Sequence, residues 1–131
     1  SPGKGGDSLV EMIITNNPSV VEKYPDKVLF IDGSVEKVLI KVRDLVYEGC
    51  DLISHPLPAS LRILFSPYRS IIIGRNNRRV DPLQAVIVED SIHKYKRHMD
   101  VRRADKVNRD DYKLMDLILL ESALDDEQGK W

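Results

Sequence analysis

The first half of the chain repeats one local pattern three times: a short apolar segment, a short polar cluster, and then a predicted helix start. The apolar segments begin at Met12, Val28 and Cys50. Short runs that are rich in β-branched and large aliphatic residues are typical of strands. Strands that alternate with helices favour an α/β fold, in which polar residues gather where the strands end. The pattern therefore predicts a fold class and also the place of a site.

The clearest predicted helix lies between Ser34 and Gly49. From Val35 to Val46 the apolar residues follow one another at spacings of three and four, which gives one continuous apolar stripe. Ser34 is a good N-cap, and Gly49 stands where a helix commonly ends in left-handed geometry. Three further helices are predicted: a short one that starts at Asn17–Pro18 and stops before Pro25, one at about 82–99 and one at about 109–124.

The segment 55–70 is predicted to be a long irregular loop. It holds three prolines, at positions 56, 58 and 67, and shows no clear helical period. Prolines at these positions argue against a helix or a central strand. Loops of this length in compact domains are usually functional or mobile. Four strands remain around these segments, at Met12–Thr15, Val28–Ile31, Cys50–Ser54 and Ile71–Ile73.

We therefore expect a single α/β domain over residues 11–125. Short connections and right-handed crossovers favour a small three-layer sandwich with a mostly parallel sheet of about four strands and helices on both faces. Residues 1–10 are glycine-rich and are expected to be disordered or an expression-vector remnant, and 126–131 to be a tail.

Composition excludes several classes of protein. The chain has 131 residues, of which 42% are hydrophobic and 31% charged, as in one globular domain. Its apolar runs are too short for a membrane span. The net charge of −1 gives no overall attraction to nucleic acid, and 6% aromatic residues leave few stacking partners for RNA. We expect neither a membrane nor a nucleic acid as partner.

Motifs for metals and cofactors are missing from the sequence. His55, His93 and His98 do not show the spacing of zinc ligands. There is no glycine-rich phosphate loop and no dinucleotide-binding motif. The single cysteine, Cys50, cannot form an internal disulfide, and no secretory signal is visible. We expect no metal, no cofactor and a cytoplasmic location.

Charge is distributed unevenly in the second half of the chain. Lysine and arginine dominate from 75 to 103, whereas 110–127 is mostly acidic. Two solvated helix faces that attract each other explain this distribution, and the alternative is a surface for an acidic partner. The last predicted helix carries more apolar positions than one stripe needs, which favours a homodimer.

The ends of the first two predicted strands supply candidate ligand-binding residues. Asn16 and Asn17 follow the first strand, and Gly33 and Ser34 follow the second. A helix N-terminus offers free backbone amides and the positive end of the helix dipole, which together bind anions. The simpler interpretation is that these residues only cap helices and form turns.

His55 is the candidate catalytic residue. It follows the third predicted strand, where an imidazole could act as an acid or a base near neutral pH. The simpler interpretation is a ring that hydrogen-bonds a loop carbonyl. Tyr68 and Arg69 precede the fourth strand, and an arginine fork there could grip a carboxylate or a phosphate. The alternative is an exposed arginine at the start of a strand.

Several short motifs resemble one known family. The chain contains TNNP at Thr15–Pro18, LIKVRDLV at Leu39–Val46, HPL at His55–Leu57 and SPYRS at Ser66–Ser70, and EDSI at Glu89–Ile92 also fits. In these motifs it resembles the GrdX-type proteins, which are encoded beside the glycine, sarcosine and betaine reductase components of amino-acid-fermenting anaerobes.

The resemblance covers about residues 12–99. After HPL the family has small polar residues, whereas this chain continues with Pro58, Ala59 and Ser60 and then an apolar run. The resemblance implies a cytoplasmic protein tied to reductase metabolism, with a reductase component as a partner. It carries no catalytic residues over to this chain.

Two functions are consistent with these observations. The first is a non-catalytic accessory protein that binds a small anion or a partner protein. The alternative is a small enzyme in which His55 is the acid or base and Arg69 holds the carboxylate or phosphate of the substrate.

Overall fold

The computed structural model describes residues 10–101 and 107–129, so the expected disordered start lies almost wholly outside the described residues. The elements, in chain order, are β1 (Val10–Thr15), α1 (Pro18–Lys23), β2 (Val28–Phe30), α2 (Val35–Glu48), β3 (Cys50–Leu52), α3 (Leu61–Leu64), β4 (Ser70–Asn76), α4 (Pro82–Val101) and α5 (Arg109–Gly129).

The four strands form one mixed sheet in the order β2-β1-β4-β3. β1 and β2 pair in parallel, with Ile13 opposite Val28. β4 runs antiparallel to both of its neighbours, β1 and β3. The predicted number of strands is confirmed, but the prediction of a mostly parallel sheet is wrong, because only one of the pairs is parallel.

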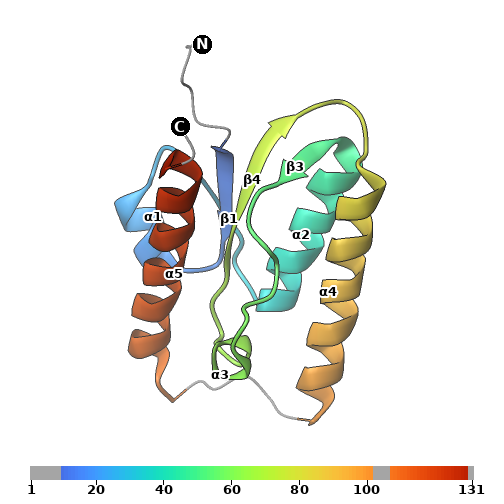
Figure 1. Cartoon of the computed structure of the whole chain (residues 1–131). Helices are drawn as coiled ribbons and strands as arrows, with labels where there is room; N and C mark the ends of the chain where they lie inside the picture. The colour runs from blue at the N-terminus through green and yellow to red at the C-terminus, as the bar shows by residue number, and fades with distance from the viewer. Residues whose placement is uncertain (1–9, 102–106, 130–131) are drawn as a thin grey trace.

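The connection between β3 and β4 explains this difference. A parallel partner needs a crossover that carries the chain back to the other end of the sheet. Here the chain after β3 forms only the short helix α3, which lies beyond the end of the strands (Figure 1). The chain therefore enters β4 from the end where β3 stopped, and it must run in the opposite direction. The prediction that 55–70 contains no helix is also wrong, because α3 fits between Pro58 and Pro67.

The three amino-terminal strands nevertheless point the same way. β1 and β3 are both antiparallel to β4, and β2 is parallel to β1. The carboxyl end of β1 lies beside the beginning of β4, where Thr15 is opposite Ser70. One edge of the sheet thus brings together the segments that follow β1, β2 and β3 and the segment that precedes β4.

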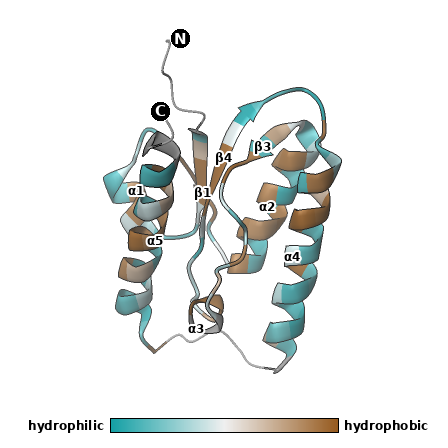
Figure 2. Cartoon of the chain, viewed as in Figure 1, coloured by the Kyte–Doolittle hydropathy of each residue, from teal (hydrophilic) through white to brown (hydrophobic). Residues whose placement is uncertain are grey.

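Alternate residues of the central strands enter two separate apolar clusters. Ile14, Ile71 and Ile73 pack with residues of α2 and α4, whereas Ile13 and Ile72 pack with residues of α1 and α5. Figure 1 shows α2 beside α4 and α1 beside α5, with the strands between the two pairs. Figure 2 shows the apolar colouring of β1 and β4 between these helices. Helices therefore cover both faces of the central strands. Successive side chains of a strand point to opposite faces of the sheet, so each face has its own apolar cluster.

The predicted helix starts are confirmed. Asn17 caps α1 by accepting a hydrogen bond from the amide of Ser19, and Ser34 caps α2 by accepting one from the amide of Lys37. Gly49 ends α2 with φ +112°, in the left-handed region that favours glycine. β3 is shorter than predicted and β4 is longer. α5 continues to Gly129, so the expected tail from 126 is helical up to that residue.

Among the residues that the structure describes, none of the helices has the length and apolar character needed to cross a membrane.

Candidate functional site

A cavity of about 280 Å³ lies between the loop after β3, the beginning of β4 and one face of α5. Small-molecule sites in proteins span roughly 300–1,000 Å³, so this cavity suits a small ligand. Three kinds of side chain line it: apolar ones, hydroxyls, and the ionisable groups of an arginine, an aspartate and a histidine. The lining residues are Ser54, His55, Pro58, Ala59, Ser60, Ile63, Arg69, Ser70, Asp116, Leu119, Leu120 and Ala123.

Arg69 is the basic residue of this cavity, and it is only 5% exposed. One terminal nitrogen, Nη1, donates to the carbonyl of Pro56 at 2.9 Å, and Nη2 donates to the carbonyl of Leu64 at 3.4 Å. These bonds hold the guanidinium on the loop. Nε has no hydrogen-bond partner among the described residues, although it is buried.

Burial lowers the pKa of Arg69 to about 10, against the attraction of Asp116 and Tyr95, which raises it. The guanidinium is therefore still charged at neutral pH. A buried charge with an unused N–H is costly unless a partner accepts from it. Arg69 thus places a charged group at the cavity wall, and one of its N–H groups, at Nε, lacks a hydrogen-bond partner among the described residues.

Asp116 is the acidic residue of the cavity, and it is 6% exposed. Its Oδ2 accepts from the hydroxyl of Ser70 at 2.6 Å and from the amide nitrogen Nδ2 of Asn17 at 3.0 Å. Burial raises the pKa of Asp116, whereas these two hydrogen bonds and the charge of Arg69 act in the opposite direction. The carboxyl group therefore ties α5 to the ends of β1 and β4.

A short chain of hydroxyls extends this network under the sheet edge. The hydroxyls of Thr15 and Ser70 are 2.7 Å apart, and Thr15 Oγ1 accepts from the backbone amide of Asn17 at 2.9 Å. Asn17 also donates to the carbonyl of Lys113 at 3.0 Å. The strand ends and α5 are thus joined by polar bonds that are largely shielded from water, which fixes the position of the cavity wall.

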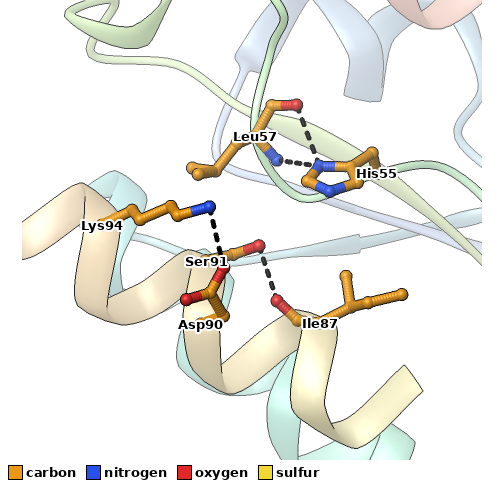
Figure 3. A network of polar contacts seen from close by, with 6 residues as sticks. All are labelled: His55, Leu57, Ile87, Asp90, Ser91 and Lys94. Carbon is orange, nitrogen blue, oxygen red and sulfur yellow. Dashed lines mark hydrogen bonds and ion pairs between the residues drawn. The ribbon is translucent and has the colours of Figure 1, made fainter. Parts of the chain in front are cut away.

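His55 lies on the cavity wall but is exposed to solvent. Its Nδ1 is 3.0 Å from the backbone nitrogen and 3.1 Å from the carbonyl oxygen of Leu57, as Figure 3 shows. If Nδ1 accepts from the amide, the proton of the neutral ring lies on Nε2. The α4 side chains Asp90 and Ser91 in the same view bond within α4. The backbone of the loop therefore orients the imidazole, as the simpler interpretation expected.

The other predicted site residues, except Asn17, line a second cavity of about 270 Å³ near the start of α2. There the side-chain amide of Asn16 is fully engaged: Nδ2 donates to the carbonyls of Gly33 and Pro67, and Oδ1 accepts from the backbone nitrogen of Arg69, all at 2.9 Å. Asn16 therefore connects three segments of the protein. The residues lining this cavity are Asn16, Gly33, Ser34, Val35, Pro67, Tyr68, Tyr95 and Arg109.

The structure thus divides the predicted site between two cavities. His55 and Arg69 share the first, whereas Asn16, Gly33, Ser34 and Tyr68 share the second. Asn17 lines neither cavity and is fully buried as a helix cap. Arg69 connects the two, since its backbone bonds Asn16 while its side chain reaches the first cavity. The ligand-binding roles of these residues stay predictions.

Sequence reasoning missed Asp116, which is the second buried charge of the site. The signal was present in the last helix. Tyr112, Asp116 and Leu120 follow one another at a spacing of four, and all three are buried in the structure. An acidic residue between two apolar ones on a buried helix face is unusual, and it points to a functional or bonded carboxylate.

The described residues contain no group of three or more histidine, cysteine, aspartate or glutamate side chains that could hold a metal ion. Cys50, which is half-buried, has its pKa raised by burial first and by neighbouring acids second. A thiol with a raised pKa is a weak nucleophile near neutral pH.

The raised pKa of Asp116 gives a testable pH dependence. Between the ordinary and the raised pKa, the folded protein binds more protons than the unfolded chain, so the free energy of unfolding falls as pH rises through this window. Asp116→Asn keeps the acceptor for Ser70 and cannot ionise. We expect the stability of the variant relative to wild type to increase as pH rises through the window.

Urea unfolding of both proteins across the acid to neutral range measures this difference. A difference that stays constant, or that decreases as pH rises, would contradict the assignment of a raised pKa to Asp116.

The sequence matches a family model described as GrdX-like protein over residues 12–125, which confirms and extends the resemblance in its motifs. No curated protein and no solved structure matches the chain. The matched range includes most of β1, all of β2 to β4 and most of α5, and it contains every residue that lines the two cavities. The chain therefore belongs to the GrdX-like protein family.

Proposed function

We propose that this protein is a non-catalytic accessory protein that binds a small carboxylate or a similar small anion in the Arg69 cavity. Membership of the GrdX-like family associates it with glycine reductase operons. The proposal depends on one observation: a guanidinium that is 5% exposed lines a cavity while its Nε lacks a hydrogen-bond partner among the described residues.

The geometry of Arg69 supports binding rather than a purely structural role. Carbonyl oxygens of Pro56 and Leu64 orient the guanidinium, but neither of them neutralises its charge. An anion accepting from the guanidinium would form charge-assisted hydrogen bonds, which are stronger than bonds between neutral groups. The small volume and the largely apolar wall limit the ligand to a few carbon atoms beside its anionic group.

Replacement of Arg69 tests the proposal. Arg69→Met keeps an unbranched side chain of similar length and removes the charge and the donors. We expect titration calorimetry with acetate, glycolate and phosphate to show binding by the wild type, weakened by about 10- to 100-fold in Arg69→Met, as for loss of a hydrogen bond to a charged group.

Arg75→Met is the matched control, because Arg75 lies on β4, the strand that directly follows Arg69, but is exposed. It should bind like wild type. Thermal melts must show that both variants are folded. No binding of any probe by the wild type, or equal binding by folded Arg69→Met, would contradict the proposal.

The alternative function, a small enzyme, is favoured by one observation: His55 lines the same cavity as Arg69. In that case His55 Nε2 would exchange a proton with a substrate held by Arg69. His55→Ala separates the two functions. An accessory protein should keep its ligand affinity and show no turnover before or after the change, whereas an enzyme should lose its turnover.

We also propose, on separate grounds, that α5 takes part in a homodimer or in contact with a reductase component. Leu114, Ile118 and Leu119 of this helix are each about half exposed although they are large and apolar. Such residues on one helix favour a protein partner. Analytical ultracentrifugation of the wild type and of Ile118→Glu tests the homodimer: a monomeric wild type would exclude it.

A further inference from the structure

The first cavity carries a buried basic group and a buried acidic group from different parts of the fold. Arg69 directly precedes β4 and Asp116 lies on α5, and they are 5% and 6% exposed. Both line the cavity. Among the described residues no ion pair joins them, since the partners of Asp116 Oδ2 are Ser70 and Asn17 and those of the guanidinium are backbone carbonyls.

This arrangement disfavours a ligand with a single charge. A simple anion accepts hydrogen bonds from Arg69 but meets the carboxylate of Asp116 inside a space with little water, where like charges repel strongly. A simple cation meets the opposite difficulty. A ligand that carries both charges pairs with both groups and leaves neither of them uncompensated.

The apolar part of the cavity wall fits the part of such a ligand that joins its two charges. Pro58, Ala59, Ile63, Leu119 and Ala123 supply apolar surface, and their side chains have no charge to compete for the ligand. A volume of about 280 Å³ holds a short aliphatic chain but not a nucleotide or a peptide.

We propose that the ligand is a small zwitterion, an amino acid or a similar ammonium carboxylate, whose carboxylate is bound by Arg69 and whose cationic group is bound by Asp116. This inference rests on the proposed function, because it takes Arg69 as the anchor of the carboxylate. It adds the second charge of the ligand and the residue that selects for it.

Matched pairs of probes test the second charge. Each pair differs only in an ammonium or a hydroxyl group: glycine with glycolate, alanine with lactate, and γ-aminobutyrate with γ-hydroxybutyrate. The titrations are done at mildly alkaline pH, which favours the deprotonated form of Asp116, whose pKa is raised by burial, while Arg69, with a pKa of about 10, is still charged. In at least one pair the wild type should bind the amino compound about 10-fold more tightly than the hydroxy compound.

Asp116→Asn should abolish this preference. The variant is close to isosteric and keeps an oxygen that accepts from Ser70 and Asn17, so its fold should survive, which a thermal melt checks. Without the carboxylate the cavity has a net positive charge, so the hydroxy acid should bind at least as tightly as before and the amino compound about 10-fold less tightly.

The outcomes separate this inference from the proposed function. If the wild type binds the two members of every pair equally, or if folded Asp116→Asn leaves a preference unchanged, the zwitterion is excluded while Arg69 can still bind anions. If Arg69→Met has no effect on any of the probes, or the wild type binds none of them, both the proposed function and this inference fail.

Discussion

Replacing Asn17 with alanine is expected to lower the free energy of unfolding by about 3 kcal/mol, from a lost helix cap and lost bonds in the interior. Asn17 is fully buried, and its Oδ1 accepts from the amide of Ser19 at 3.0 Å. Its Nδ2 donates both to Asp116 and to the carbonyl of Lys113 at 3.0 Å. The alanine leaves the acceptors on α5 without this donor and weakens the connection between α1 and α5.

Asn77→Ala is the control for this prediction. Asn77 is exposed, and its backbone amide donates a hydrogen bond to the carbonyl of Gly49, which the substitution leaves in place. Its replacement should change the free energy of unfolding by less than about 0.5 kcal/mol, as is usual for surface positions. Urea unfolding monitored by circular dichroism measures both variants. A loss in Asn17→Ala no larger than in the control would show that the buried amide does not hold α5 on the sheet.

Gly49→Ala is expected to lower the free energy of unfolding by about 3 kcal/mol, because it adds a Cβ both to a left-handed backbone and to a tightly packed position. Gly49 has φ +112°, a conformation in which a Cβ is strained. The added Cβ would also lie 2.8 Å from the backbone nitrogen of Arg79 and 2.9 Å from that of Arg78. These neighbours are backbone atoms of the turn after β4, so they cannot move aside as a flexible side chain could.

Glu48→Ala is the matched control, because Glu48 is the exposed residue that precedes this glycine at the end of α2. It should leave the unfolding midpoint nearly unchanged. The same urea series measures both variants. Similar stability of Gly49→Ala and wild type would mean that the turn after β4 does not pack against the end of α2 as the structure has it.

The local parts of the fold could be predicted from sequence because their causes are local. The apolar stripe of α2 is bounded by Ser34, which caps its start, and by Gly49, which ends it, and the structure confirms both. Asn17 and Pro18 likewise mark the start of α1. In each case residues within one or two turns of the helix determine where it begins or ends.

The direction of β4 could not be predicted in the same way. It depends on where the chain goes between β3 and β4. There the short helix α3 keeps the chain at one end of the sheet, and the three prolines at 56, 58 and 67 made a helix in this segment hard to predict. Strand order depends on contacts between segments far apart in sequence, such as Thr15 and Ser70. No local pattern encodes such a contact.

The candidate site could be predicted only in part, because some of its residues meet through contacts between segments far apart in the sequence. Arg69 and His55 were found because they lie beside strand ends, and they do line one cavity. Asp116 contributes from a helix whose place over the sheet edge is decided by packing, so its meeting with Arg69 was not visible. Asn16 was expected at the ligand, whereas its amide joins Gly33, Pro67 and Arg69.

The most direct test of the Arg69 cavity as a ligand site follows the Nε–H signal of Arg69 by nuclear magnetic resonance, assigned by its loss in Arg69→Met. During titration with the matched probes, we predict that this signal shifts with saturation, together with the backbone amides of Ser70 and Asp116. Shifts confined to the second cavity, at Gly33, Ser34 and Tyr68, or an Arg69 Nε–H signal that does not respond to any probe, would contradict the account.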